Sequence, residues 1–136
     1  MKTKTIVTFL TVFLLLFANL NLFSQQTSLQ TQKEDNAKVD VYYFHFNTRC
    51  ETCRAVESEA KADVSMLFGK DVSFAAYNLD KPDGEAKGKE LGVNSQTLLV
   101  VIGEKKVNLT NEGFLYARTE PEKFKKIIEE KIKPLL

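Results

Sequence analysis

Cys50 and Cys53 are the only two cysteines of this 136-residue chain, and they stand three positions apart. On a helix, residues with this spacing are neighbours, with Cβ atoms about 5–6 Å apart. A small adjustment brings such a pair to disulfide geometry. The pair can therefore open and close with little movement of the backbone. It could be a reactive dithiol, a structural disulfide or part of a metal site.

The structural and metal alternatives each meet a physical objection. In the chain-entropy model, closing a loop of four residues stabilises a fold by about 2 kcal/mol, whereas a loop of 15 residues gives about 3 kcal/mol. A structural zinc site needs four ligands, and this pair supplies two. The single histidine, His45, falls within a predicted strand and is best interpreted as a packed residue. We expect no metal and no cofactor, although a two-coordinate copper site stays open as an alternative.

The elements around the pair decide where each sulfur lies. Residues 39–47 are rich in Val, Tyr and Phe on both faces, which is typical of a buried strand. From Cys50 onward the apolar residues follow a helical period, and Gly69 ends the run as a C-cap would. Cys50 is thus expected at the helix N-terminus, where backbone N–H groups stabilise a thiolate. Cys53 falls on the apolar stripe and should be more buried.

These positions predict different roles for the two sulfurs. Cys50 would be the exposed nucleophile, and Cys53 would be the resolving thiol that attacks a mixed disulfide at Cys50. Arg49 and Arg54 add positive charge near Cys50, and Glu51 opposes it. An acid beside the sulfur disfavours the thiolate, so we do not expect a strong oxidant.

The remaining pattern predicts an α/β fold with the order β-α-β-α-β-β-α. Strands are expected at residues 71–80, 97–102 and 105–109, and helices at about 81–92 and 119–136. Thr119 and Glu122 match a capping box at the start of the last helix. The two βα units imply parallel strands, and the terminal hairpin adds antiparallel ones. The result is a mixed sheet of about four strands flanked by helices.

This arrangement resembles the thioredoxin-like family of CxxC thiol–disulfide oxidoreductases. The resemblance rests on "YYFHFNTRCETCRAVE" and on "LGVNSQTLLVVIGEKKV", and with the element order it covers residues 39–136. It implies that the loop 95–97 faces the dithiol. The residues that it places around the cysteines are Arg49, Glu51, Thr52, Ser95, Gln96 and Thr97.

The chain also departs from that family. The usual cis-proline before the third strand is missing, because Ser95-Gln96 stands there, and we expect a trans peptide. Phe44 replaces the buried acid of thioredoxins, so the proton of Cys53 must use another group or water. Glu51-Thr52 replaces the familiar pairs between the cysteines. These differences put the handling of substrate in question.

The first 24 residues have the pattern of a signal peptide. Lys2 and Lys4 precede an apolar run from Ile6 to Phe17, and Ser24 ends a plausible cleavage site. An uncleaved segment would be of borderline length for a membrane anchor. Residues 25–38 are polar and read as a flexible lead-in to the domain at 39–136. We therefore expect an exported protein, periplasmic or secreted.

Three functions follow from these observations. The leading hypothesis is an exported thiol–disulfide oxidoreductase, a single domain that acts on protein or small-molecule dithiols and disulfides. The alternatives are a thioredoxin-like binding module with weak or no redox activity, and a copper carrier that uses Cys50 and Cys53. The net charge is +1, without a basic block, so nucleic-acid binding is not expected. We expect a monomer.

Overall fold

The computed structural model describes residues 38–136. The predicted signal peptide (1–24) and all of the predicted lead-in (25–38) except Lys38 lie outside the described residues. The elements are β1 (Val39–His45), α2 (Glu51–Phe68), β2 (Val72–Asn78), α3 (Pro82–Leu91), β3 (Thr97–Ile102), β4 (Lys105–Asn108), α4 (Thr110–Tyr116), α5 (Pro121–Ile132) and the 3-10 helix η1 (Lys133–Leu135). The predicted order is confirmed, and α4 is an additional short helix.

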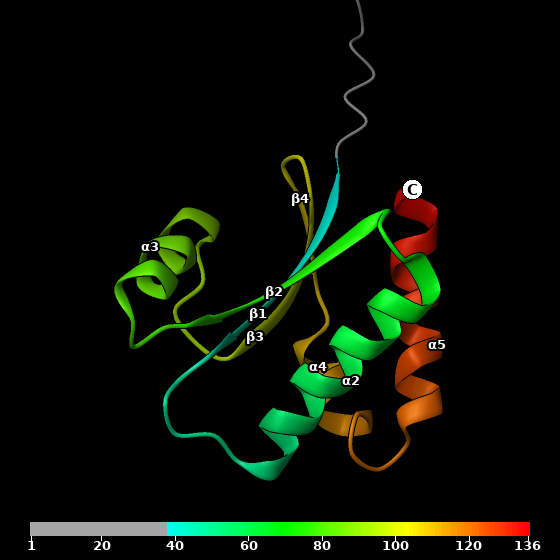
Figure 1. Cartoon of the computed structure of the whole chain (residues 1–136), viewed down its shortest axis with the longest axis horizontal. Helices are drawn as coiled ribbons and strands as arrows, with labels where there is room; N and C mark the ends of the chain where they lie inside the picture. The colour runs from blue at the N-terminus through cyan, green and yellow to red at the C-terminus, as the bar shows by residue number, and fades with distance from the viewer. Residues whose placement is uncertain (1–37) are drawn as a thin grey trace, which may run out of the picture. The chain divides into compact units, whose positions relative to one another are not determined.

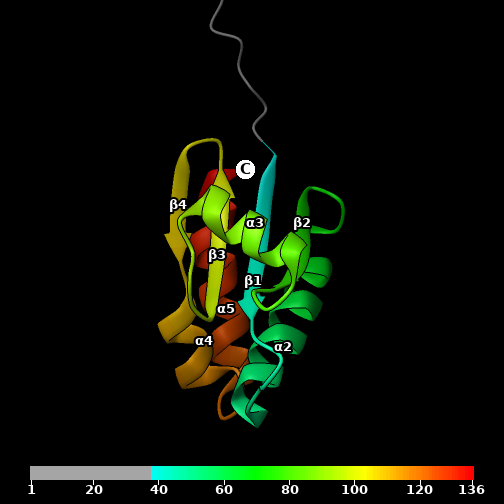
Figure 2. The same cartoon turned by 90° about the vertical axis from the view of Figure 1, so that its left-hand side faces the viewer.

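The four strands form one mixed sheet in the order β2-β1-β3-β4. β1 runs parallel to β2, as expected for a βα unit, and antiparallel to β3, while β3 and β4 form the predicted hairpin. β1 and β3 are central, which agrees with their apolar sequences. β4, with its lysines, lies at the edge, as Figure 2 shows.

Helices cover both faces of the sheet (Figure 1, Figure 2). α3 lies on one face, and α2, α4 and α5 lie on the other. The alternation of side chains along β1 explains why both faces are apolar. Val41 and Tyr43 join the core beneath α2 and α5, whereas Phe44 stacks on Tyr77 of β2. Successive residues of a strand point to opposite faces, so an aromatic strand of this kind needs cover on both.

The larger core lies between the sheet, α2 and α5. The apolar stripe of α2 supplies Val56, Ala60 and Val64, and all three are buried. The last helix, α5, supplies Phe124, Ile128 and Ile132, which are also buried. Burying a side chain of this size stabilises the fold by about 1.5–3 kcal/mol relative to leaving it in water.

The start of α5 differs from its prediction. Glu120 is the N-cap residue, and no side chain caps the helix. The hydroxyl of Thr119 instead donates to the carbonyl of Leu115 at 3.0 Å, so the capping box with Glu122 does not form. The cause is α4, which ends at Tyr116. Carbonyl groups in the last turn of a helix lack a partner within the helix, and the Thr119 hydroxyl bonds one of them.

A close contact between helices brings α4 to the N-terminal half of α2. Gly113 of α4 is buried, and a Cβ atom there would lie 2.9 Å from Cγ1 of Val56. Glycine thus allows this short helix to pack directly on α2, one turn beyond Cys53. Within residues 38–136, no helix combines the length and the apolar character needed to cross a bilayer.

Candidate functional site

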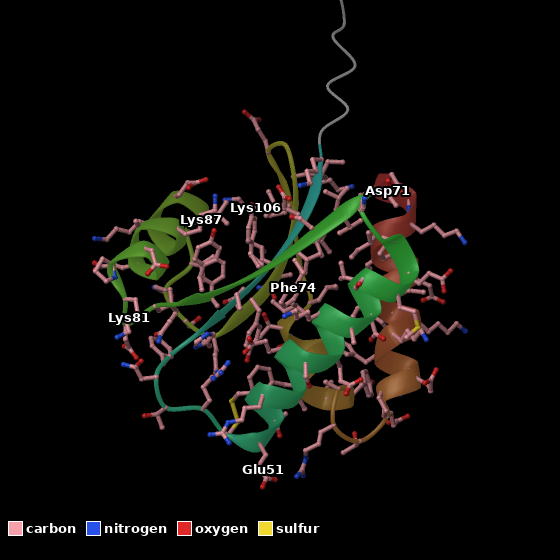
Figure 3. All side chains as sticks on the ribbon, viewed as in Figure 1. Glu51, Asp71, Phe74, Lys81, Lys87 and Lys106 are labelled. Carbon is pink, nitrogen blue, oxygen red and sulfur yellow. A yellow bond between two sulfur atoms is a disulfide. The ribbon has the colours of Figure 1, made fainter. Side chains whose placement is uncertain are left out.

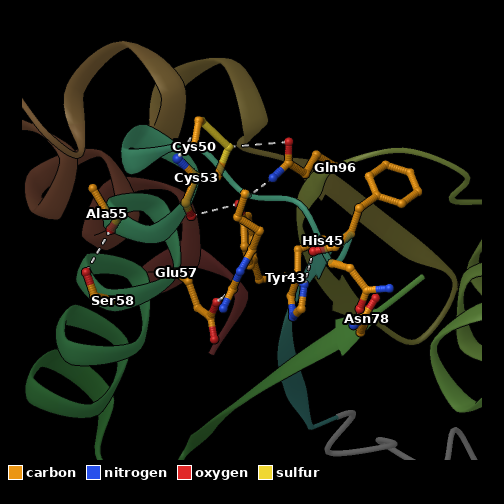
Figure 4. A network of polar contacts seen from close by, with 12 residues as sticks. Tyr43, His45, Cys50, Cys53, Ala55, Glu57, Ser58, Asn78 and Gln96 are labelled. Atoms are coloured by element: carbon orange, nitrogen blue, oxygen red, sulfur yellow. Dashed lines mark hydrogen bonds and ion pairs between the residues drawn. A yellow bond between two sulfur atoms is a disulfide. The ribbon is translucent and has the colours of Figure 1, made fainter. Parts of the chain in front are cut away.

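Cys50 and Cys53 form a disulfide at the N-terminus of α2, with their Cα atoms 5.1 Å apart. Cys50 is the N-cap residue and is exposed, and its Sγ accepts a hydrogen bond from the backbone N–H of Cys53 at 3.2 Å. Cys53 is buried, with 4% of its surface exposed. The predicted difference between an accessible and a sheltered sulfur is therefore present. Figure 4 shows the bond between the two labelled cysteines.

The loop between β1 and α2 is held by the neighbouring strand. The backbone N–H of Asn47 donates to Oδ2 of Asp80 at 2.6 Å, and Nδ2 of Asn78 donates to Oδ1 of Asn47 at 2.7 Å. The N–H of Leu79 donates to the carbonyl of His45 at 2.7 Å. These bonds tie the segment that precedes Cys50 to the end of β2. The first cysteine thus begins its helix from an anchored loop.

Two of the three charges expected near Cys50 lie in ion pairs, and the third, Arg54, is exposed. Arg49 forms an ion pair with Glu57, one turn beyond Cys53, and both side chains are partly buried. Glu51 is largely exposed and pairs with Arg118, which follows α4, at 3.2 Å. We expected Arg49 and Glu51 to act on the sulfur as opposing charges. Each of these two side chains has its own counter-ion, which leaves the helix N-terminus and Arg54 as the positive groups beside Cys50.

The site lies at one end of α2. Figure 3 shows Glu51 at this end, next to the yellow bond of the disulfide, and Asp71, which follows the helix, at the other. Thr52 is half-buried between the two cysteines.

The loop before β3 faces the disulfide, as the resemblance implied. Oε1 of Gln96 lies 3.5 Å from Sγ of Cys53. Ser95 is exposed and contributes its carbonyl, which accepts from Oγ1 of the buried Thr97 at 2.9 Å. No peptide bond within residues 38–136 is cis, so the expected trans peptide at Ser95-Gln96 is present. Gln96 therefore presents an amide to the sulfur in place of a proline ring.

Tyr43 is a site residue that the sequence reasoning missed. Its side chain is fully buried under the disulfide, and its hydroxyl donates to the carbonyl of Cys53 at 2.8 Å. Nε2 of Gln96 donates to the same hydroxyl at 3.4 Å. Burial, followed by the negative charge of Glu57, raises the pKa of Tyr43 to about 12, although Arg49 and the bond from Gln96 oppose the shift. The phenol therefore stays protonated at neutral pH.

The residues around the disulfide support two-electron sulfur chemistry. An accessible sulfur at a helix N-terminus can attack, and a neighbouring sheltered sulfur can resolve the product. Among residues 38–136, no group of three or more His, Cys, Asp or Glu side chains could hold a metal ion. The amide oxygen of Gln96 lies against the buried sulfur, and the protonated phenol of Tyr43 contacts that amide.

Comparisons with known proteins support the fold. Trxlp from Edwardsiella tarda EIB202 has a similar structure, with a TM-score of 0.50 and 17% sequence identity over 69% of this chain and 84% of that one. Thioredoxin f2 of Chlamydomonas reinhardtii gives a TM-score of 0.47 at 18% identity, over 72% of this chain and 82% of its own. No family model and no curated protein sequence matches the chain. The chain has a thioredoxin-like fold with a CxxC pair that can form a disulfide.

Proposed function

We propose that this protein is an exported thiol–disulfide oxidoreductase that exchanges disulfides through Cys50 and Cys53. The observation that carries the proposal is the unequal exposure of two bonded sulfurs at one helix N-terminus. A purely structural disulfide gains nothing from leaving one sulfur accessible. Export rests on the pattern of residues 1–24, and it would place the dithiol in a compartment where disulfides persist.

The reaction follows from the two positions. In the reduced protein, Cys50 loses its proton to water. Its thiolate then attacks one sulfur of a substrate disulfide and forms a mixed disulfide, and the first substrate thiolate leaves and takes a proton. Cys53 then loses its proton to water, and its thiolate attacks Sγ of Cys50. This step releases the second substrate thiolate, which is protonated in turn, and forms the Cys50–Cys53 disulfide. The dithiol thus gives two electrons and two protons to the substrate.

The backbone around Cys50 assists the first attack. The N–H of Cys53 already points at Sγ of Cys50 in the disulfide. In the dithiol form the same N–H can stabilise the negative sulfur, together with the dipole of α2. The sulfur of Cys53 instead faces the amide oxygen of Gln96, which cannot donate a hydrogen bond to a thiolate. The asymmetry supports attack by Cys50 and resolution by Cys53.

Single cysteine variants test this assignment with glutathione disulfide as the substrate. Cys50→Ser should abolish reduction of the substrate. Cys53→Ser should stop at a mixed disulfide with glutathione, which mass spectrometry detects as a covalent adduct. Equal activity of the wild type and of the Cys50→Ala, Cys53→Ala double variant would refute the proposal. Stoichiometric copper(I) binding without exchange would favour a metal carrier instead.

A further inference from the structure

Gln96 lies between the buried sulfur and the buried phenol. Its Oε1 is 3.5 Å from Sγ of Cys53, and its Nε2 is 3.4 Å from Oη of Tyr43 (Figure 4). The two ends of a glutamine amide differ chemically, since the oxygen accepts hydrogen bonds and the nitrogen donates them. The direction of the amide therefore decides whether Cys53 faces an acceptor or a donor.

Tyr43 fixes that direction. A phenol has one proton, and Tyr43 donates it to the carbonyl of Cys53 at 2.8 Å. Its oxygen can then only accept, so the amide of Gln96 must turn its N–H toward Tyr43. The amide oxygen is left facing Sγ of Cys53. The orientation thus follows from the hydrogen-bond network.

We propose that Gln96, oriented by Tyr43, is a positioning residue that accepts a hydrogen bond from the Cys53 thiol in the reduced protein and keeps that thiol protonated. This inference rests on the proposed function for its role in exchange. An acceptor stabilises S–H and opposes the thiolate, whose charge would face the amide oxygen. The amide takes no proton itself, so the proton of Cys53 still leaves to water before the resolving attack.

Two consequences follow for the exchange reaction. Cys50 alone is held ready as a thiolate, which directs attack to the exposed sulfur. The resolving step is slowed, because it needs the thiolate of Cys53, and the mixed disulfide at Cys50 lives longer. This device suits a substrate whose release must wait, such as a protein chain that needs time to dissociate from the surface around Cys50.

Other charged groups around Cys53 do not replace this contact. Glu57 follows Cys53 on α2 and is paired with Arg49 from the preceding loop. Glu51 and Arg118 form their pair at the surface. His45 is the last residue of β1, and its Nδ1 lies 3.0 Å from the carbonyl of Phe46. Residues 95–97 carry no ionisable side chain.

The test uses the fact that Cys50→Ser leaves Cys53 as the only thiol of the chain. Ultraviolet absorbance of the thiolate then gives the pH at which half of Cys53 is ionised. Gln96→Leu should lower this midpoint by about one pH unit, which is the size of one hydrogen bond. Tyr43→Phe should lower it at least as much, because the freed amide can turn its N–H to the sulfur. Gln96→Glu should raise it.

A double variant separates this role from a structural one. Tyr43→Phe should have no further effect in the Gln96→Leu background, since the phenol acts through the amide. Tyr77→Phe removes a hydroxyl on the opposite face of the sheet and should leave the midpoint unchanged. An unchanged or raised midpoint in both Gln96→Leu and Tyr43→Phe would overturn the inference, as would full additivity in the double variant.

Kinetics in the chain with both cysteines give a second readout. A midpoint lower by one unit yields tenfold more Cys53 thiolate, and the weaker nucleophile reduces the gain to about threefold. Resolution of a glutathione mixed disulfide should therefore be about threefold faster in Gln96→Leu. An unchanged or slower resolving step would contradict the role in exchange. If the wild-type protein exchanged no disulfides, the proposed function would be wrong. The titration of Cys53 would still test the contact with the amide of Gln96.

Discussion

Asp63 gives a prediction about stability that the structure makes quantitative. This residue lies on α2, is 5% exposed, and its Oδ2 is buried without a hydrogen-bond partner among residues 38–136. Burial raises the pKa of Asp63 from 3.8 to about 6. Glu59 and Glu122 add to the shift, and Lys125 opposes it. We expect Asp63→Asn to remove a pH-dependent cost from the folded state.

The sign follows from proton linkage. The folded state holds the proton of Asp63 more tightly than the unfolded state does. The contribution of protonated Asp63 to the free energy of unfolding is therefore greatest below about pH 4. That contribution is lost as the pH rises through about 6. A shift of about two pH units corresponds to about 3 kcal/mol. Solvent screening of the charges on Glu59, Glu122 and Lys125 reduces the expected change to about 1–2 kcal/mol.

Urea unfolding between about pH 4 and pH 7.5 measures this difference. The free energy of unfolding of Asp63→Asn should rise relative to the wild type by about 1–2 kcal/mol across that range. The new amide can also change the free energy of unfolding by a constant amount at every pH. Such a constant difference is not part of the prediction. Asp71→Asn, at an exposed position after α2, is the matched control and should follow the wild type. Parallel curves for Asp63→Asn and the wild type would refute the reasoning.

Three further predictions concern the backbone, the disulfide and the ion pair. Gly84→Ala should lower the free energy of unfolding by about 1–3 kcal/mol, because its Cβ would overlap the carbonyl of Asn78; an unchanged thermal midpoint would contradict this close packing of α3 on β2. Reducing the disulfide should lower the urea stability by about 2 kcal/mol, and equal stability of the two forms would show that the short loop contributes no chain entropy. Glu57→Gln should lower the pKa of Tyr43, since it removes the negative charge that helps to raise it and leaves Arg49 unpaired; a tyrosinate absorbance titration that shows a higher pKa would be inconsistent with this account.

Much of the fold could be predicted because local and global signals agree. The change from an aromatic strand to a helical period at Cys50 marked the end of one element and the start of the next. Gly69 ended the helix at the expected place and has a φ of 56°, a conformation that glycine adopts without strain. The burial of Cys53 followed from the apolar stripe, and the exposure of Cys50 followed from its place at the helix N-terminus.

The rest depended on contacts between distant residues. α4 is a seven-residue helix, which is too short for a clear apolar period. It packs on α2 because Gly113 can approach Val56 closely, and no local sequence pattern reveals such a contact. Tyr43 looked like an ordinary core aromatic, because nothing in a strand sequence shows where a hydroxyl will find its acceptor. The ion pair of Arg49 could have been suspected, since Glu57 stands one helical turn after Cys53.

The reduction potential of the Cys50–Cys53 pair tests the central claim most directly. The protein would be equilibrated with defined ratios of reduced and oxidised glutathione or dithiothreitol, and the fraction of disulfide measured after alkylation. Our account predicts a potential among those of redox-active dithiols that are not strong oxidants, between about −270 and −180 mV. A value below about −300 mV, with a disulfide that resists exchange, is typical of a structural bond and would contradict the account.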